Sequence, residues 1–379
     1  MSKKKKGGGI RYEHGIPEAF LLRVKEMFGQ SVFSEVEKTF VMRPTTLRIN
    51  GIKSQKHQNT ETQKHFVVDD VKEVLNNDGF KLQQVPWYKD AYILENKTKR
   101  ELIDTEVYQK GEIYVQSLAS MVPPLVLDPK PGEKVLDLTA APGSKTSQMA
   151  AMMGQVGELV ANDNNKIRFF KLKHNMEGLG VIDAHGPHPN PPLIGEGVRV
   201  PPPMRGRRST EEERLGGGPD IDVWKFSLRL EEGWKICEEY GPYFDKILLD
   251  APCSAEARFV TDNVKSYGYW KEHKIKEMAY KQRTLLFSAW SALKPGGTLV
   301  YSTCTFAPEE NEMQISRLLE RYPDEAEILP IDIAGLKTLQ PLKEWKGKVF
   351  HPSVQKAIRL WPTKEVEGFF VAKLRKKTT

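Results

Sequence analysis

Two cysteines follow short apolar runs, and a cysteine thiolate is a strong nucleophile. Cys253 closes the sequence Asp250-Ala-Pro-Cys, and Cys304 follows Ser302 and Thr303. Both apolar runs are typical of buried strands, and ligands of wound parallel sheets bind at the carboxyl ends of the strands. The pattern therefore predicts that both thiols lie at a ligand-binding edge. The third cysteine, Cys237, lies in a helical stretch without a motif and is interpreted as a small buried residue.

A turn rich in small residues gives a second candidate site. Asp137-Leu-Thr-Ala-Ala-Pro-Gly-Ser-Lys-Thr146 leads from a strand into a helix. Such a turn lets a ligand approach the free backbone N–H groups and the helix N-terminus. Asp163 ends the next strand, the usual place for a carboxylate that binds ribose hydroxyls. The phosphate-binding loop and the dinucleotide fingerprint are both absent. The layout indicates an adenosine-containing ligand, although spacing alone leaves an ordinary strand–helix turn equally open.

Beyond about Gly111, apolar strands alternate with helical periodicity. This alternation predicts an α/β fold with a wound, mostly parallel sheet. Strands are expected at 134–139, 158–163, 244–250, 297–303 and 369–374. One helix is expected to start at about 144, and a second follows the strand at 158–163 and ends at about 176. A third is expected over about 272–292, and Lys294-Pro-Gly-Gly ends it.

The residues before this alternation predict a smaller α+β region. A helix is expected at 17–28, and Thr46 to Asn50 alternates like a strand. We assign 1–10 to a disordered basic tail, 11–110 to the N-terminal α+β region and 111–379 to the main domain. Residues 186–218 are rich in Pro, Gly and Arg without periodicity, which predicts a disordered insertion in that domain.

Composition narrows the class of protein. The 379 residues carry a net charge of +7, which favours polyanionic partners because bound Lys and Arg release counterions from phosphates. No apolar run is long enough to predict a membrane span, and the basic start lacks the apolar stretch of a secretory signal. Three cysteines without a C-x-x-C pair favour a reducing, cytoplasmic setting without structural zinc. We expect no metal in the site and a monomeric chain.

Three motifs occur in a fixed order: Thr139-Ala-Ala-Pro-Gly-Ser-Lys-Thr146, Asp250-Ala-Pro-Cys-Ser254 and Ser302-Thr-Cys-Thr305. Together they resemble the Sun/Fmu (NSUN-type) family of RNA cytosine-5 methyltransferases, and flanking segments agree from about residue 40 onward. The resemblance implies a Rossmann-like methyltransferase core preceded by a small RNA-binding region. It also implies S-adenosylmethionine as the cofactor and ribosomal or transfer RNA as the substrate.

The resemblance assigns roles to individual residues. It implies a cofactor pocket formed by Thr139, Ala140, Ala141, Pro142, Gly143, Ser144, Lys145, Asp163 and Asp250. It implies Cys304 as the nucleophile and Cys253 as the residue that assists product release. DNA cytosine-5 methyltransferases use the cysteine of a Pro-Cys pair, which would point to Cys253 instead. Sequence physics does not decide between the two thiols, and the better match to the RNA family favours Cys304.

The implied reaction explains the residue types. Carbon 5 of cytosine becomes electron-rich only after a thiolate adds to carbon 6, so the reaction is covalent catalysis. A free cysteine has a pKa of about 8.5, so the thiol needs a positive environment. The addition also needs a proton or hydrogen bond at N3, which Asp250 is placed to supply if an apolar site favours its protonated form. The target base must be unpaired or flipped out.

A missing carboxylate and the insertion at 186–218 leave a second hypothesis open, and one loop also departs from the family pattern. The family usually has an acidic residue just past the third strand, where the segment 223–230 offers Ser227 and no carboxylate. Ala255-Glu-Ala-Arg258 stands where a glycine is more usual, which predicts a stiffer loop. The alternative is a ribosome-associated RNA-binding factor on a methyltransferase scaffold with little or no catalysis. The intact cysteines and Asp250 argue against it.

Several residues are candidate RNA contacts. Arg43 and Arg48 lie in the basic N-terminal region, which favours RNA as the partner. Tyr267, Tyr269 and Trp270 follow the Cys253 loop and could stack on a base. Packing beneath the loop is an equal alternative for these three aromatic residues.

Overall fold

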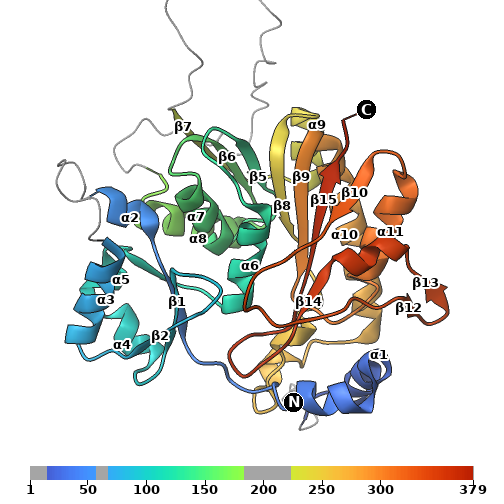
Figure 1. Cartoon of the computed structure of the whole chain (residues 1–379), viewed down its shortest axis with the longest axis horizontal. Helices are drawn as coiled ribbons and strands as arrows, with labels where there is room; N and C mark the ends of the chain where they lie inside the picture. Colours follow the sequence, from blue (N-terminus) through green and yellow to red (C-terminus); the bar gives the residue numbers. More distant parts are fainter. Residues whose placement is uncertain (1–14, 57–66, 183–222, 379) are drawn as a thin grey trace, which may run out of the picture.

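The computed structural model describes residues 15–56, 67–182 and 223–378. The expected basic tail at 1–10 and the expected insertion at 186–218 lie outside the described residues. The described chain forms a four-stranded sheet, a nine-stranded sheet and a small two-stranded ribbon, β12 (Glu344–Trp345) with β13 (Lys348–Val349) (Figure 1).

The larger sheet contains five parallel strands in the order β9-β8-β5-β6-β7. These are β5 (Lys134–Asp137), β6 (Gly157–Asn162), β7 (Trp224–Arg229), β8 (Phe244–Asp250) and β9 (Leu293–Thr303). Antiparallel strands extend the sheet beyond β9: β15 (Phe369–Lys376), β14 (Ile358–Leu360), β11 (Thr338–Leu339) and β10 (Ala326–Leu329). The predicted α/β class and the predicted strands are confirmed.

One strand starts earlier than predicted. The helix before it ends at Ala292, as Lys294-Pro-Gly-Gly suggested, but β9 begins at Leu293 rather than at Gly297. Leu293 pairs with Phe244, and the register then shifts before Thr298 pairs with Lys246. The Pro-Gly-Gly segment is therefore an irregularity within the strand, because the pairing resumes on both sides of it.

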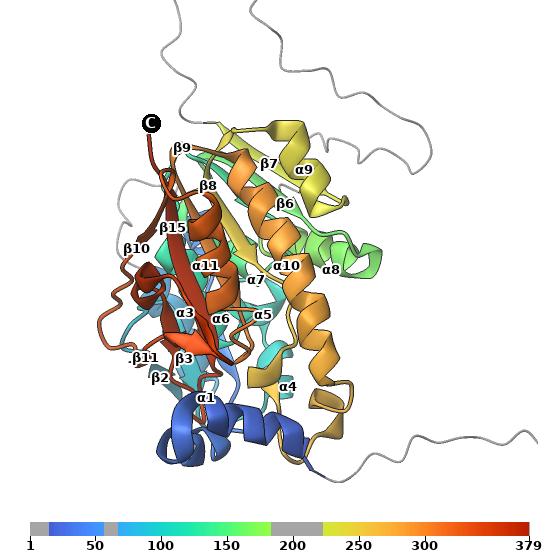
Figure 2. The same cartoon turned by 90° about the vertical axis from the view of Figure 1, so that its right-hand side faces the viewer.

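Two helical layers cover the faces of this sheet (Figures 1 and 2). Successive strand residues point to opposite faces, so Val135 and Leu136 belong to different buried clusters. One face carries α6 (Leu118–Leu127), α7 (Ser144–Met152) and α8 (Lys166–Gly178). The other carries α9 (Gly233–Tyr240), α10 (Glu272–Ala292) and α11 (Glu312–Arg321). Cys237 of α9 is fully buried there, which confirms its interpretation as a core residue.

The smaller sheet is antiparallel, in the order β2-β3-β1-β4. Its elements are β1 (Thr46–Ile49), α2 (Gly51–Lys56), α3 (Val67–Asn77), β2 (Leu82–Gln84), β3 (Ala91–Leu94), α4 (Lys99–Ile103), α5 (Glu106–Gln109) and β4 (Ile113–Val115). The sheet extends past the expected boundary at residue 110, because β4 pairs with β1 and Ile113 completes the buried cluster of this region.

Arg48 was expected at the RNA surface, and this expectation is wrong. Its side chain is 1% exposed and donates hydrogen bonds to Gln116 and to Ser147 of α7. Arg48 therefore joins the smaller sheet to the helix that follows the small-residue turn. A buried guanidinium with such partners contributes to docking and is unavailable to a polyanion.

The first helix, α1 (Glu18–Glu37), is longer than the predicted 17–28 and is interrupted at Gly29. It packs against the large core rather than the smaller sheet (Figure 2). The Phe20 ring lies 4.8 Å from the ring of Phe259, and Arg23 forms ion pairs of 2.9 Å with Glu272 and Glu309. Helix α1 thereby supports the loop that follows Cys253.

Candidate active site

One cavity of about 1010 Å³ joins the two predicted sites at the carboxyl ends of the parallel strands. The predicted residues that line it are Thr139, Ala140, Ala141, Pro142, Ser144, Lys145, Asp163, Asp250, Cys253 and Cys304. Topology explains the meeting, because β5, β6, β8 and β9 are parallel and so end at the same edge. The small-residue turn and the two thiols were predicted as separate sites. In the fold they form the two ends of one cavity.

Gly143 is the one predicted residue outside this lining, and its role in the turn is steric. Its φ of +105° lies in the region that favours glycine. A Cβ there would lie 2.6 Å from Met176 Cε and 2.9 Å from Leu172 Cδ1 of α8. A side chain at this position would therefore push the turn away from α8.

Asp163 is held from several sides at the turn end of the cavity. Its side chain is 2% exposed and accepts hydrogen bonds from the N–H groups of Ala141 (3.2 Å) and Asn165 (3.0 Å). Arg168 lies 3.3 Å from the same carboxylate and donates to the Ala141 carbonyl. The side chain is therefore fixed before any ligand arrives.

The expectation of free N–H groups holds for only part of the turn. Ala140 N–H donates to Asn162, Ala141 N–H to Asp163 and Gly143 N–H to Ala140. The N–H groups of Ser144, Lys145 and Thr146 precede the first hydrogen bond of α7, which Ser147 N–H donates to the Gly143 carbonyl, and Gly143 has no side chain to cap them. The helix N-terminus is therefore the donor surface that faces the cavity.

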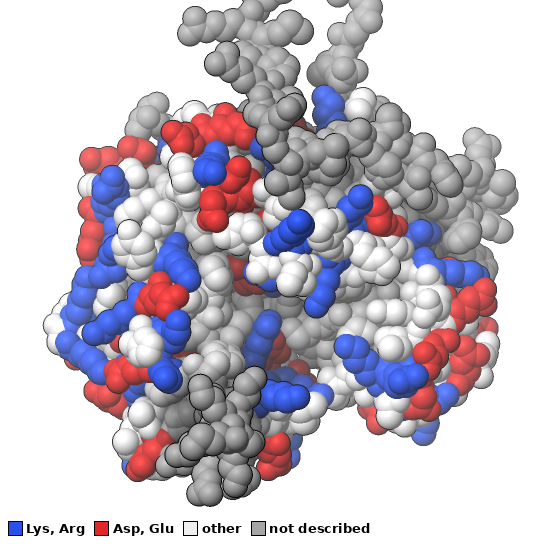
Figure 3. Space-filling view, turned by 180° about the vertical axis from the view of Figure 1, so that it is seen from behind, with Lys and Arg blue, Asp and Glu red and all other residues white. Residues whose placement is uncertain are grey.

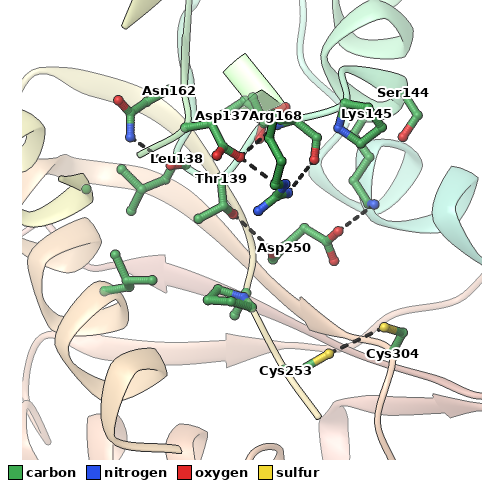
Figure 4. A pocket seen from close by; sticks show the side chains of 18 of the residues that line it. Asp137, Leu138, Thr139, Ser144, Lys145, Asn162, Arg168, Asp250, Cys253 and Cys304 are labelled. Carbon is green, nitrogen blue, oxygen red and sulfur yellow. Dashed lines mark hydrogen bonds and ion pairs between the residues drawn. The ribbon is translucent and has the colours of Figure 1, made fainter. Parts of the chain in front are cut away.

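Asp250 lies between the turn and the two sulfurs (Figure 4). One carboxylate oxygen lies 2.6 Å from Lys145 Nζ, and the other accepts a hydrogen bond from Ser302 Oγ at 2.8 Å. Lys145 Nζ also donates to Ser120 Oγ at 2.8 Å. A buried ammonium thus pairs with Asp250, so its surroundings are not the apolar ones considered for it from the sequence. The site therefore holds the Asp250 carboxylate directly beside the Lys145 ammonium.

The two thiols contact each other, with their Sγ atoms 3.3 Å apart. The hydrogen bond from Cys253 lowers the pKa of Cys304, and the positive charge of Arg258 lowers it further, against the effect of burial. The same hydrogen bond, with burial, raises the pKa of Cys253 well above its ordinary value. The surroundings therefore favour a thiolate at Cys304 and a protonated thiol at Cys253.

Buried polar side chains connect the loops that carry the thiols. Ser254 Oγ and Thr305 Oγ1 are 2.7 Å apart. Glu310 accepts hydrogen bonds from Ser254 N–H (3.0 Å) and from Gln282 Nε2 (2.7 Å), and Glu256 accepts one from Thr305 (2.8 Å). Burial raises the pKa of Glu310 to about 8. These contacts fix one thiol loop against the other.

The three candidate aromatic residues divide between packing and exposure. Tyr267 and Trp270 are buried, and Trp270 Nε1 donates to Glu256 at 2.9 Å, so both pack beneath the loop. Tyr269 is 55% exposed but does not line the cavity. Arg43 is also engaged within the protein, because it donates to the carbonyl of Ala257.

Among the polar side chains of the cavity lining that the sequence did not assign to the site are Glu232, Arg168 and Arg258. Glu232 follows β7, whereas Ser227 lies within that strand and pairs with Val160. The Glu232 carboxylate accepts a hydrogen bond from Asn164 at 3.2 Å. An acidic pair directly after an apolar strand was the available signal, so this edge does carry a carboxylate.

In the parts of the chain that the structure describes, no group of three or more His, Cys, Asp and Glu side chains could hold a metal ion. Over the same residues, no helix is both long and apolar enough to cross a membrane.

The fold and the cavity define a Rossmann-like methyltransferase. A crystal structure of a methyltransferase homolog protein from Pyrococcus horikoshii is 29% identical, with a TM-score of 0.69 and coverage of 95% of each chain. A family model described as 16S rRNA methyltransferase RsmB/F matches residues 124–186 and 210–375, more than half of the chain. The chain therefore belongs to the RsmB/F (Sun/Fmu) family of S-adenosylmethionine-dependent RNA methyltransferases, and the resemblance noted from the sequence is confirmed.

Two curated relatives show how far the similarity extends. A tRNA (cytosine(49)-C(5))-methyltransferase from Pyrococcus abyssi is 32% identical over 339 residues, which cover 88% of each chain. Ribosomal RNA small subunit methyltransferase F from Klebsiella pneumoniae is 30% identical over 368 residues. That match covers 95% of this chain but 63% of the relative, so the chain spans less than two thirds of the ribosomal enzyme.

Proposed function

We propose that the chain methylates carbon 5 of cytosine in ribosomal or transfer RNA through a covalent bond between Cys304 and carbon 6. The observation that carries the proposal is the pair of sulfurs 3.3 Å apart in the same cavity as the small-residue turn, with Asp250 between them. The names of the two curated relatives support an RNA substrate and, for the first, cytosine carbon 5.

The residues at the turn end of the cavity fit S-adenosylmethionine. The N-terminus of α7 suits a carboxylate group, and Asp163 and Glu232 suit ribose hydroxyls. A carboxylate has lone pairs for about four hydrogen bonds, so Asp163 can accept further donors beyond its protein partners. Asp250 offers a negative charge to a sulfonium. When bound, the cofactor supplies an electrophilic methyl group.

The chain's own residues perform the remaining steps. The Cys304 thiolate adds to carbon 6, and the Lys145–Asp250 pair delivers a proton to N3, which leaves carbon 5 electron-rich. After carbon 5 takes the methyl group, Cys253 acts as or positions the base that removes the carbon 5 proton. The carbon–sulfur bond then breaks, Cys304 leaves as a thiolate, and the N3 proton returns to the Lys145–Asp250 pair.

Charge on the surface is consistent with a polyanionic substrate. Figure 3 shows a face of the molecule that is hollowed near its centre, with Lys and Arg side chains around the hollow. The net charge of +7 has the same sign. Because RNA binding through phosphates weakens with salt, the apparent KM for RNA is expected to rise with salt concentration.

Transfer of a labelled methyl group tests the proposal. The full chain is incubated with radiolabelled S-adenosylmethionine and unmodified ribosomal or transfer RNA, and the nucleosides are then separated. We expect label in 5-methylcytidine, and the RNA that receives it identifies the substrate. Label in another nucleoside contradicts the proposal. No label in folded protein that still binds RNA would favour an RNA-binding factor without catalysis.

A further inference from the structure

The loop after Cys253 carries a cation that none of the three motifs contains. Arg258 ends a short 3₁₀ turn, η2 (Glu256–Arg258), and lines the same cavity as Cys253 and Cys304. Its side chain is 54% exposed, so the guanidinium is not buried in the core and can interact with groups in the cavity. Alanine residues at 255 and 257 flank Glu256 in this turn.

Two hydrogen bonds tie this turn to the strand end that carries Cys304. Ala257 N–H donates to the Cys304 carbonyl at 3.1 Å, and Glu256 accepts from Thr305 Oγ1 at 2.8 Å. Both contacts involve residues directly before Arg258 and at or next to Cys304. The backbone of Arg258 is therefore fixed relative to the thiol.

A buried carboxylate steadies the guanidinium. Glu367 Oε1 lies 3.8 Å from Arg258 Nε and also accepts a hydrogen bond from Ser117 Oγ at 2.9 Å. This ion pair is long and engages one nitrogen, and a guanidinium carries five N–H donors. Arg258 therefore keeps donors and charge available for another anion in the cavity.

The charges around Cys304 come from several elements. The groups that face it are Cys253, Arg258, Asp250, Glu367 and Tyr269, with Lys145 bound to Asp250 and Glu310 acting on Cys253. The two carboxylates oppose a thiolate, and Lys145 is neutralised by its 2.6 Å pair with Asp250. Of the two cations in this set, Arg258 is the one less committed to a carboxylate. Its charge lowers the pKa of Cys304, and the Cys304 charge in turn raises the pKa of Arg258.

We propose that Arg258 holds Cys304 as a thiolate before RNA binds, acting through the sulfur rather than on the base or a phosphate. This proposal deepens the proposed function. Only the role of the thiolate as the nucleophile rests on that function. A cysteine at its ordinary pKa is a few per cent thiolate at pH 7. A cation beside the sulfur lowers the pKa of the thiol and so raises that fraction.

Alkylation of the free protein tests the assignment without RNA or cofactor. Limiting iodoacetamide is applied across a range of pH, and modification is read separately at each cysteine by peptide mass spectrometry. Relative to wild type, Arg258→Gln is expected to raise the Cys304 midpoint by about one unit and to slow its alkylation at pH 7 several-fold. Arg258→Lys restores most of the shift, and Arg258→Met reproduces the effect of Gln.

Arg283→Gln is the matched control, since it removes the same charge from α10 at a position outside the cavity lining. It should leave the Cys304 midpoint where it is. An unchanged midpoint in both Arg258→Gln and Arg258→Met overturns the proposal. A raised KM for RNA with that unchanged midpoint would assign Arg258 to a phosphate instead. The titration needs no methyl transfer. An inactive wild type would therefore contradict the proposed function, whereas the pH dependence of Cys304 alkylation would still test the role of Arg258.

Discussion

The two ends of the cavity are built differently. At the turn end, the carboxylates have different neighbours and fixed partners: Asp163 with Arg168 and backbone N–H groups, and Asp137 with Thr146 Oγ1 at 2.7 Å. At the thiol end, two identical side chains touch, and only their surroundings distinguish them. The comparison teaches that one end is specified by residue type and the other by environment.

The difference follows from how each end is assembled. The turn end comes from consecutive elements, β5, α7, β6 and the start of α8. The thiol end joins residues 51 positions apart and depends on buried Glu310 and Glu256 to hold the loops together. A local pattern in the sequence can encode the first kind of site, whereas the second requires the tertiary fold.

The largest expected effect comes from a substitution at the thiol end. Cys304→Ala removes the proposed nucleophile, and we expect methyl transfer to fall on the order of 10⁴-fold or more, because the proposed covalent bond to carbon 6 forms at this sulfur. RNA binding should persist, which filter binding measures. Cys237→Ala is the control, since it removes a buried thiol outside the cavity. Equal loss of activity in both variants would contradict a specific role for Cys304.

The next largest effect is expected at Asp250, which lies between the two ends of the cavity. Asp250→Asn removes the charge that pairs with Lys145, and we expect kcat to fall by roughly 10²–10⁴-fold, the usual contribution of acid–base catalysis. The comparison is Asp245→Asn on the same strand, where the carboxylate pairs with Lys294 instead. Single-turnover kinetics should separate the two variants, and similar rates would count against Asp250.

A smaller effect is confined to the turn end. Asp163→Asn should weaken S-adenosylmethionine binding by about 10–100-fold, as expected for loss of a hydrogen bond to a charged group. The alkylation profile of Cys304 should stay unchanged, since the two ends are separate in construction. Equilibrium binding measures the affinity, with the exposed Asp262→Asn as the control. Unchanged cofactor affinity in Asp163→Asn would remove this residue from the binding site.

The smallest effect concerns two buried carboxyl groups, Glu310 behind the thiols and Asp137 at the turn end. Burial raises the pKa of Glu310 to about 8 and that of Asp137 to about 7. Between the unfolded pKa values, about 4.3 for Glu and about 3.9 for Asp, and these raised values, the folded state binds more protons than the unfolded state. The free energy of unfolding should therefore fall as pH rises through this window, by at most about 1.4 kcal/mol per pH unit for each group.

Glu310→Gln should flatten this slope, because the neutral side chain no longer titrates. Urea unfolding at several pH values measures the slope, and Glu238→Gln, at an exposed position of α9, serves as the control. A slope that Glu310→Gln leaves as steep as wild type would show that Glu310 does not carry the excess proton.

Much of the fold and part of the site could be predicted from sequence. Strand periodicity placed Asp163, Asp250 and the two cysteines at strand ends, and parallel pairing then brought them to one edge. The prediction that Arg48 contacts RNA was wrong, because nothing in the sequence around a single arginine shows that its side chain is buried. Arg258 was invisible as a neighbour of Cys304, because their proximity depends on a hydrogen bond between two loops.

The most direct test of the account is the covalent intermediate itself. Cys253→Ala, incubated with RNA and S-adenosylmethionine, should accumulate a protein–RNA adduct that survives denaturing electrophoresis, because attack and methyl transfer proceed but release fails. Cys304→Ala and the double variant should form none. An adduct in Cys304→Ala and none in Cys253→Ala would contradict the account and reverse the roles of the two thiols.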